Sequence, residues 1–489
     1  MGRRSEGVGQ RNILGRCHPS DSLTDRSMKI LLIEPAKAPL TIGGEDVFIY
    51  EPLALEYIAA GVVRDHDVKI LDLRIERDLQ GVLRDFHPDV VGITSYTVHV
   101  NTVRRLFEEI KGWNPQVLTV VGGHHATMVP EDFLSPYIDL IVIGEGVFPF
   151  KEIIARFEKG GTLDGIPGNA IPKGDSLFRA DSPVTVDLDV FPFPERKLTM
   201  KYRRHYYSEW MKPLASIRTS KGCPHRCKFC AQWKLTGGRY LRRKPEKIAE
   251  ELAGLEEEFV FFADDESLVD SQRMKNLARL IRDAGIRKRY FLYGRSDTIC
   301  RNPELLEMWR GIGLERVFVG LEFLKDEDLA YIRKGSTASD NDKAINILQD
   351  LDIDIYASFI VRQEFKKEDF LALRQYCRKL KLDFASFAVL TPLPGTDFYE
   401  EAKNQLITDN YDYFDFIHTL LPTALPLNEF YEEYYNLYKK AVPFSKQFLL
   451  ILKKMPMQEI PSLIKKSNRV LNQLKNAYRD YREYSQQKR

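Results

Sequence analysis

The stretch Thr219-Ser-Lys-Gly-Cys-Pro-His-Arg-Cys-Lys-Phe-Cys230 decides how the whole chain is interpreted. It spaces Cys223, Cys227 and Cys230 as C-x3-C-x2-C, directly after a short apolar run typical of a buried strand. A loop this tight can wrap one cubane iron–sulfur cluster with three thiolates, which leaves the fourth iron without a protein ligand. An open coordination position of this kind can bind a substrate or cofactor. We therefore predict a 4Fe-4S cluster on these cysteines.

A zinc site is the alternative interpretation of the same cysteines. It requires a fourth ligand, for which His225 or His205 is available. Zinc-binding modules more often present paired C-x2-C hooks, however, and the sequence contains no second hook. Three of the six cysteines fall within eight positions, a crowding that indicates a metal or redox site in a reducing compartment. We therefore expect a cytoplasmic protein.

An alternation of strands and helices begins at the run before the cysteines and continues for six units. The expected strands are Ala215–Thr219, Phe259–Phe262, Tyr290–Tyr293, Val317–Gly320, Ile355–Val361 and Phe384–Leu390. Six units are enough for an incomplete barrel rather than the usual eight. Barrel enzymes keep their chemistry at the carboxyl ends of the strands, and the cysteines follow the first strand here. Residues 213–397 are therefore predicted to form a partial (β/α)6 barrel.

A similar alternation precedes the barrel and predicts an open, doubly wound parallel sheet over residues 28–160. The expected strands are Lys29–Ile33, Val68–Leu71, Val90–Thr94, Leu118–Val121 and Leu140–Ile143. The expected helices are Leu53–Val63, Val100–Trp113 and Phe148–Lys159. Ligands bind such sheets over the carboxyl ends of the strands. The first strand is followed by Glu34-Pro-Ala-Lys-Ala-Pro39 instead of G-x-G-x-x-G, which argues against a dinucleotide.

The remaining segments are distinguished by composition. Residues 1–27 hold five arginines without an apolar core, so we expect a disordered extension rather than a signal peptide. Residues 161–212, rich in Gly, Pro and charge, are expected to be a linker, and residues 398–489 a helical C-terminal region. Its last 49 residues carry 11 Lys or Arg against three Asp or Glu. The net charge of the whole chain is only +2, and we expect no nucleic-acid partner.

With Phe229 before its third cysteine, the loop resembles the signature of radical S-adenosylmethionine (radical SAM) enzymes. In that family the open iron chelates SAM, and an electron from a donor such as flavodoxin or ferredoxin cleaves SAM to a 5′-deoxyadenosyl radical. The resemblance implies that strand-end carboxylates accept hydrogen bonds from the SAM ammonium. An arginine would pair with its carboxylate or ribose, and the fourth strand end would contact the ribose. The implied SAM contacts are Phe229, Ala263, Asp264, Asp265, Arg295, Gly320 and Glu322.

An open α/β domain ahead of such a barrel resembles the cobalamin-binding class of radical SAM enzymes. Small residues would let the cobalamin tail approach the backbone, and hydroxyl groups would bind its phosphate and ribose. The implied contacts are Thr94, Ser95, Tyr96, Gly122, Gly123, His124, Gly144, Glu145 and Gly146. One departure is clear: many cobalamin domains carry D-x-H-x-x-G, whereas this chain has Asp72-Leu-Arg-Ile-Glu-Arg77. The lower face of cobalt would therefore lack an imidazole from this position.

Within that class, the chain resembles the hopanoid C-3 methylase type. The resemblance is carried by Ile286–Leu292 with Arg295, Arg301-Asn302, Ser358–Val361, Thr391–Thr396, and Leu420–Pro426 followed by Phe430-Tyr431. It implies methylation of an unactivated carbon of a hydrophobic polycyclic or isoprenoid lipid, through methylcobalamin and a 5′-deoxyadenosyl radical. The aromatic residues after the barrel could line an apolar pocket, or they could simply form packed core. These residues are Phe398, Tyr399, Tyr411 and Tyr413.

Two alternatives to this function stay open. His99 and Gly123-His-His-Ala126 resemble chlorin-modifying relatives, which favours a cobalamin-dependent cyclase or another tetrapyrrole-modifying enzyme. A zinc-stabilised binding module without enzymatic activity is the second. The basic tail also has two interpretations, a solvated helical face or a peripheral contact with an anionic membrane. The tail residues concerned are Lys453, Lys454, Lys465, Lys466 and Arg469, beside Leu449–Leu452 and Leu463-Ile464.

Overall fold

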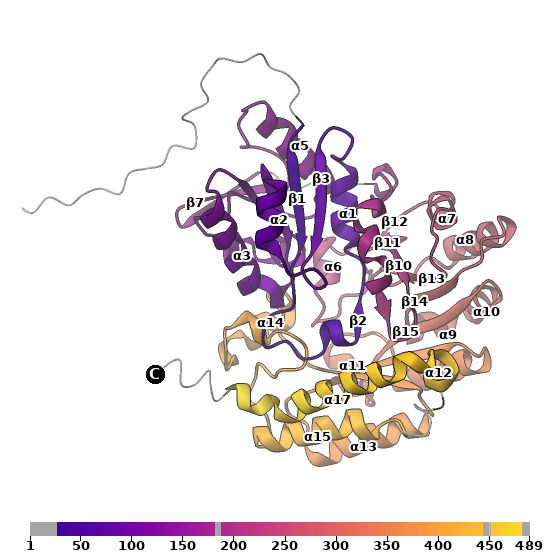
Figure 1. Ribbon diagram of the computed structural model, residues 1–489. Coiled ribbons are helices and arrows are strands. Elements are labelled where there is room, and N and C mark those ends of the chain that lie inside the picture. Colours follow the sequence, from indigo (N-terminus) through magenta and orange to yellow (C-terminus); the bar gives the residue numbers. More distant parts are fainter. Residues whose placement is uncertain (1–26, 181–186, 444–448, 450, 482–489) are drawn as a thin grey trace, which may run out of the picture.

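The computed structural model describes residues 27–180, 187–443, 449 and 451–481 (Figure 1). The extension expected over residues 1–27, including Cys17, lies outside the described residues apart from residue 27. The last eight residues of the basic tail also lie outside them. Among the described residues, no helix combines the length and apolar character needed to cross a bilayer.

The first sheet has seven strands in the order β3-β1-β4-β5-β6-β7-β8. Five are parallel and confirm the predicted strands: β1 (Lys29–Glu34), β3 (Asp67–Asp72), β4 (Val90–Thr94), β5 (Leu118–Gly122) and β6 (Leu140–Val142). Helices cover both faces: α1 (Leu53–Ala60) and α5 (Val147–Glu158) pack on one, α2 (Leu79–Phe86) and α3 (Val100–Trp113) on the other. Burial on both faces explains why these strands are continuously apolar in the sequence.

The segment expected to be a linker is partly built into this sheet. Its first part forms an antiparallel hairpin of β7 (Asn169–Lys173) and β8 (Ser176–Arg179) on the edge of β6. The sheet is therefore mixed, and it extends past residue 160. The hairpin escaped prediction because Pro172 and the polar residues around it hide the strand pattern. Further along, β9 (Tyr207–Ser208) pairs with β2 (Phe48–Ile49) and ties the segment to the first domain.

The second sheet confirms the six predicted barrel strands. All are parallel and paired in chain order: β10 (Leu214–Ile217), β13 (Phe259–Phe262), β14 (Arg289–Arg295), β15 (Leu314–Glu322), β16 (Asp354–Val361) and β17 (Phe384–Val389). Within the described residues β17 does not pair with β10, so the barrel stays open along one side. The crossover helices are α7 (Pro245–Ala253), α8 (Ser271–Asp283), α9 (Ser296–Arg301), α10 (Pro303–Gly311), α11 (Asp326–Tyr331), α12 (Ala338–Asp350) and α13 (Lys367–Lys379).

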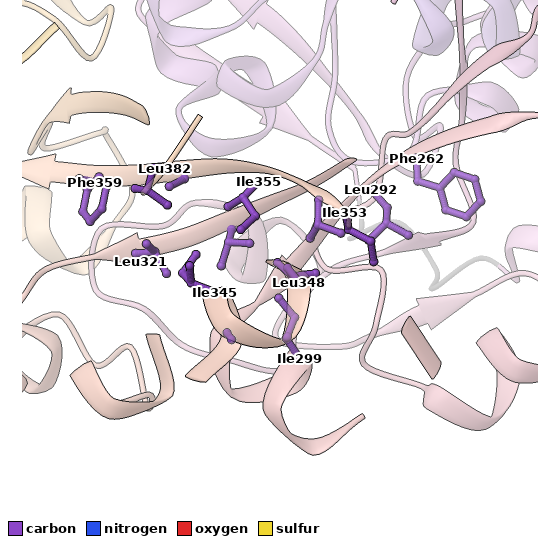
Figure 2. Packing of buried hydrophobic residues seen from close by; sticks show 14 of the residues in the cluster. Phe262, Leu292, Ile299, Leu321, Ile345, Leu348, Ile353, Ile355, Phe359 and Leu382 are labelled. Atoms are coloured by element: carbon purple, nitrogen blue, oxygen red, sulfur yellow. The ribbon is translucent and has the colours of Figure 1, made fainter. Parts of the chain in front are cut away.

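Successive residues of the barrel strands face opposite sides of the sheet. The outward side chains form the largest core of the protein, against the crossover helices. Figure 2 shows Phe262, Leu292, Ile355 and Phe359 of the strands packed beside Ile299, Ile345 and Leu348 of the helices. Each of these strand residues is at most 2% exposed. The alternate positions face the barrel interior.

The helical C-terminal region packs against the barrel rather than standing apart from it. It contains α14 (Asp397–Ala402), α15 (Leu427–Lys440) and α17 (Ile460–Asn476), and the last two lie together along one side of the barrel (Figure 1). Three of the five singled-out basic residues bind within the chain. Lys454 pairs with Glu315 and Asp354 at the amino ends of β15 and β16, Lys466 contacts the Tyr207 hydroxyl, and Arg469 pairs with Asp46.

Candidate active site

The carboxyl edges of the two sheets meet at a partly buried ion-pair cluster. Glu145, in the loop after β6, pairs with Lys221 and lies 3.5 Å from Arg218 Nη1. Lys221 belongs to β11 (Ser220–Lys221), which pairs with β12 (Leu241–Arg242) and leads directly into the cysteine loop. Burial favours the neutral acid, but the two cations outweigh it and hold the pKa of Glu145 at about 2. A residue expected to contact cobalamin thus ties the first domain to the cysteine loop.

Two carboxylates after β13 set the backbone of the cysteine loop. Asp264 Oδ1 accepts hydrogen bonds from the amides of Thr219 (2.7 Å) and Ser220 (2.8 Å). Asp265 Oδ2 accepts one from the amide of Gly222 (2.6 Å). Gly222 is required here, because its φ is +85° and a Cβ would lie 2.1 Å from a backbone oxygen. The buried Asp264 therefore supports the loop, while Asp265 is only partly buried and keeps acceptor capacity.

The cysteine loop is also held from its far side. The amide of Lys228 donates to the carbonyl of Ile332 (2.9 Å), and the indole of Trp233, in α6 (Gln232–Leu235), donates to the carbonyl of Cys227 (3.0 Å). Burial raises the pKa of Cys223 to about 11 and that of Cys230 to about 12. A metal centre overcomes this penalty, because a coordinating thiol is deprotonated by the metal's charge.

The three cysteines lie on one loop, within electrostatic reach of one another. Within the described ranges, no three His, Cys, Asp or Glu side chains converge closely enough to hold one ion. Each thiolate of a cubane binds a different iron, so the sulfurs of a cluster site stand farther apart than the ligands of a single ion. The zinc alternative thus finds no converging set of ligands among the described residues.

The ends of β14 and β15 carry a second set of buried charges. Glu322 pairs with Lys334 at 2.7 Å, and both are less than 10% exposed. Gly320 makes room for this pair, since a Cβ there would lie 2.4 Å from the Glu322 carboxylate. Arg295 is likewise buried and bound within the chain. Of the expected SAM contacts, Glu322 and Arg295 therefore have protein partners in this structure.

Phe229, Ala263 and Glu266 also lie at this edge of the barrel. Phe229 packs beside Phe398 and Phe323, and Ala263 donates its amide to the carbonyl of Ile217 (2.8 Å). Sequence reasoning missed Glu266, which is 2% exposed and has its pKa raised to about 7 by burial. It also missed Lys334, which lies in the loop after α11. Neither residue stands in a recognisable motif, although Glu266 directly follows the predicted Asp264-Asp265 pair.

The edge of the first sheet is built from close backbone contacts. Gly123 has a φ of +101°, and a Cβ on it would lie 2.7 Å from both the Ser95 amide and the Thr94 hydroxyl. The Ser95 amide donates to the carbonyl of Gly122 (2.9 Å). On the next strand, the amide of Gly144 donates to the Thr127 hydroxyl (3.0 Å), while Gly146 begins the turn into α5. Few side chains project from this edge, which we call the smooth edge and which comprises Thr94, Ser95, Gly122, Gly123, Gly144 and Gly146. It suits a large ligand that approaches the backbone.

Aromatic rings stand on this smooth edge. Tyr96 is 48% exposed, and its ring meets His124 edge-on at a centroid distance of 4.8 Å and His99 at 5.9 Å. Burial lowers the pKa of His124 and of His99 to about 4, so both imidazoles are neutral at pH 7. The Nδ1 atom of His99 is buried with no hydrogen-bond partner among the described residues. A neutral edge with an unsatisfied polar atom fits an extended ligand such as cobalamin.

Arg74 stands at the position where many cobalamin domains have their cobalt-ligating histidine. Its guanidinium binds the Asp72 carboxylate through Nε (2.8 Å) and Nη2 (2.7 Å), and Nη2 also donates to the carbonyl of Tyr50 (2.8 Å). Burial raises the pKa of the adjacent Glu34 to about 7. This position therefore carries the guanidinium of Arg74, held by Asp72 and Tyr50, and no imidazole.

The interior of the barrel is lined with aromatic rings. Tyr293 and Phe318 are 4.9 Å apart between ring centroids, Phe318 and Tyr356 are 5.3 Å apart, and Tyr50 stacks on Phe261 at 4.6 Å. Partial exposure is kept by Tyr50, Tyr293, Phe318 and Tyr356. The neighbouring strand residues that face outward are buried. The alternation within each strand could have revealed these positions, because successive side chains face opposite sides.

The aromatic residues predicted as a possible pocket have another role. Phe398 is 6% exposed and packs in a small core, and Tyr413 is 3% exposed. Tyr411 donates its hydroxyl to Asp132 and so joins the C-terminal region to the first domain. The alternative of packed core is therefore correct for Phe398 and Tyr413. Tyr399 follows Phe398 in α14, where its amide donates a hydrogen bond to the hydroxyl of the capping residue Thr396.

Comparison with known protein families agrees with this architecture. The B12 binding domain family matches residues 39–154, and the Radical SAM superfamily matches residues 217–377. The first match begins after β1 and covers the parallel strands β3, β4, β5 and β6, and the second covers the barrel from the end of β10 to α13. Fold, site and family matches together define a cobalamin-binding radical SAM enzyme.

Comparison with individual proteins shows which family within this class the chain belongs to. The chain is 33% identical over 425 residues to hopanoid C-3 methylase of Methylococcus capsulatus, which covers 84% of this chain and 81% of that one. It is 28% identical over 372 residues to the anaerobic magnesium-protoporphyrin IX monomethyl ester cyclase of Rubrivivax gelatinosus, covering 72% and 65%. The chain belongs to the cobalamin-binding radical SAM methyltransferases, the family that includes hopanoid C-3 methylase. Its cofactors are a 4Fe-4S cluster, SAM and cobalamin.

Solved structures share the same fold. The radical SAM methyltransferase TsrM from Kitasatospora setae, with cobalamin and a 4Fe-4S cluster bound, superposes with a TM-score of 0.64 at 21% identity and covers 78% of each chain. The cobalamin-dependent radical SAM enzyme OxsB, with aqua-cobalamin bound, gives a TM-score of 0.69 at 16% identity and covers 92% of this chain and 72% of that one. At these identities the likeness concerns the fold.

Proposed function

We propose that this protein methylates an unactivated carbon of a hydrophobic polycyclic or isoprenoid lipid. The observation that carries the proposal is the aromatic interior of the barrel, formed by Tyr50, Tyr293, Phe318 and Tyr356, whose side chains keep partial exposure. Apolar walls with few polar groups are typical of sites for apolar ligands. The 33% identity to a hopanoid methylase supports the same substrate class.

Each cofactor has a set of residues that suits it. Cys223, Cys227 and Cys230 would hold the cluster, and Asp265, with its spare acceptor capacity, would receive the SAM ammonium. When bound, the cluster and SAM supply a radical that removes hydrogen, and cobalamin supplies the methyl group. The protein must exclude water from the radical and hold the substrate carbon in line with both centres. The aromatic interior of the barrel serves the first task.

Cobalamin would lie over the smooth edge of the first sheet. Gly122, Gly123 and Gly144 allow close approach to the backbone, and the partly exposed Thr94 offers a hydroxyl, whereas Ser95 is buried and bonded to Tyr96 and Gly122. The neutral rings of Tyr96 and His124 would border it. No histidine follows β3, where Arg74 is instead bound to Asp72, and this supports a cobalt without an imidazole from this position.

A lipid substrate makes a peripheral membrane contact useful, and the C-terminal helices offer a surface for it. Leu452 is 40% exposed, Met457 76% and Ile464 50%, and Lys453 and Lys465 beside them are exposed. Deletion of the tail is a poor test, because Lys454 and Tyr481 bind the body of the protein. The variant L452S/M457S/I464S is sharper: we expect it to co-sediment less with anionic vesicles than wild type at unchanged stability. Equal co-sedimentation would contradict the contact.

The substrate class is tested with the reconstituted holoenzyme under anaerobic conditions. The enzyme receives SAM, cobalamin, a low-potential donor such as flavodoxin or ferredoxin, and either a polycyclic triterpenoid or a magnesium tetrapyrrole. We expect the triterpenoid to gain one methylene unit in mass. A tetrapyrrole that loses hydrogen or gains oxygen would instead favour a cyclase, the second candidate, for which the 28% identity to the Rubrivivax gelatinosus cyclase is the supporting observation.

A further inference from the structure

Arg295 is the last residue of β14 and lies at the edge where the cysteine loop sits. Its side chain is only 7% exposed, and all three of its guanidinium nitrogens are committed within the protein. Nε donates to Asp297 Oδ1 at 2.9 Å, Nη2 donates to the carbonyl of Lys334, and Nη1 points at the sulfur of Cys227 from 3.9 Å. The two firm hydrogen bonds fix the plane of the guanidinium, so the third nitrogen is held against the cysteine.

The charges around Arg295 leave Cys227 facing cations. Asp297 is shared between Arg295 and Arg301, whose Nη2 lies 2.9 Å from Asp297 Oδ2. Lys334 pairs with Glu322 and also interacts favourably with the charge of Cys227. Asp297 and Glu322 are thus each bound to one of the two cations, while Glu266 interacts with Arg295 from the carboxyl end of β13. Cys227 itself is 7% exposed, so water screens these charges little.

We propose that Arg295 is a positioning residue for the cluster, which makes the cluster easier to reduce by holding a fixed positive charge against the Cys227 thiolate. Reduction adds one electron to a centre already surrounded by three thiolates, and a neighbouring cation stabilises the more negative state. Charge and hydrogen bonds to the coordinating sulfurs are established controls on cluster potentials. The inference rests on the proposed assignment of the cluster to Cys223, Cys227 and Cys230. It departs from the sequence-based expectation that Arg295 binds SAM.

Substitution of Arg295 tests the proposal through the cluster alone. The midpoint potential of the reconstituted cluster is measured by redox titration with electron paramagnetic resonance, without SAM. We expect Arg295→Met to shift the potential to a more negative value, and Arg295→Lys, which keeps the charge, to shift it less. Arg301→Met is the matched control, because Arg301 binds the same Asp297 and its side chain is 62% exposed, while in the described part of the chain it makes no hydrogen bond to a cysteine of the loop. We expect its potential to equal that of wild type.

The outcomes separate this inference from the assignment on which it rests. Failure of the wild-type protein to take up iron would contradict the cluster assignment itself. A loaded Arg295→Met cluster with an unchanged potential would overturn the role of Arg295. If Arg295→Met loses much of its affinity for SAM while the cluster potential is unchanged, Arg295 binds SAM instead. If Arg295→Met fails to take up iron, the double variant R295M/D297N removes both charges of the pair and is held to the same criterion.

Discussion

The two carboxyl edges that face each other in this protein are built on opposite principles. The edge of the barrel is crowded with buried charges, and Asp264, Arg295 and Glu322 each already have protein partners. Over β4, β5 and β6 the edge of the first sheet consists mainly of glycines, hydroxyls and neutral rings. Its charged groups lie at the ends of β1 and β3, where Glu34 adjoins the Asp72–Arg74 pair, and at Glu145, which binds Lys221 of the other edge.

This difference suits two different cofactors. A cluster held by one short loop needs a loop of fixed shape, and buried charge-assisted hydrogen bonds supply rigidity of that kind. Cobalamin is much larger and gains from a wide surface of close backbone approach, which charged side chains would obstruct. The barrel edge is therefore organised by ion pairs, and the part of the sheet edge over β4, β5 and β6 by glycines that let a ligand approach the backbone.

The largest effect is expected at the cysteines. Cys227→Ser removes a ligand that the loop presents by its own backbone bonds, so we expect loss of the cluster and of all SAM cleavage. Iron content and visible absorbance after anaerobic reconstitution measure this. Cys300→Ser is the control, since Cys300 lies outside the loop and donates to the carbonyl of Asp340. It should keep its iron, and equal iron in both variants would contradict the assignment.

The second largest effect is expected in the aromatic interior of the barrel. Phe318→Ser removes the ring between Tyr293 and Tyr356, and we expect at least a tenfold fall in methylated product, since losing one buried aromatic contact costs about 1.5 kcal/mol or more. SAM cleavage should fall less, because the cluster is untouched. Phe178→Ser, at a residue 58% exposed on β8, should match wild type. Product formation that survives Phe318→Ser would place the substrate elsewhere.

At the edge of the first sheet, Gly123→Ala should weaken cobalamin binding and destabilise the protein. The positive φ and the 2.7 Å approach to Ser95 and Thr94 make a cost of about 1–3 kcal/mol reasonable. Gly112→Ala is the matched control: nothing lies within 4 Å of the added Cβ in helix α3, and we expect about 0.5–1 kcal/mol of stabilisation. Chemical unfolding and cobalamin titration measure both. A Gly123→Ala protein with wild-type binding would show that the smooth edge is dispensable.

The smallest effect concerns the link between the edges. The folded-state pKa of Glu145, about 2, lies below its ordinary value of 4.5, so its contribution is present above pH 4.5 and is lost as the pH falls toward 2. Glu145→Gln should cost on the order of 2 kcal/mol at pH 7, and the deficit should shrink steadily below pH 4.5. Glu152→Gln breaks only an exposed helix pair and should cost less than about 0.5 kcal/mol. A deficit independent of pH would argue against the ion pair.

The sequence predicted the fold better than the contacts at the site. The strands were recognisable because burial on both faces makes them continuously apolar, and the cysteine spacing is local. What escaped prediction depends on residues far apart in the chain. Arg295 meets Cys227 across 68 positions and Lys334 across 39, and nothing in the sequence near Arg295 records either contact. The role of Asp264 was hidden for the same reason, since its partners lie 44 and 45 positions away.

The central claim, that the two edges cooperate in methyl transfer, is tested most directly by counting the products of SAM. The holoenzyme, reconstituted with cluster and cobalamin, is incubated with reductant, a polycyclic triterpenoid and SAM carrying a deuterated methyl group. The account predicts S-adenosylhomocysteine and 5′-deoxyadenosine in equal amounts, together with a lipid product that carries the labelled methyl group. Turnover that gives 5′-deoxyadenosine and a modified product without label or S-adenosylhomocysteine would contradict it.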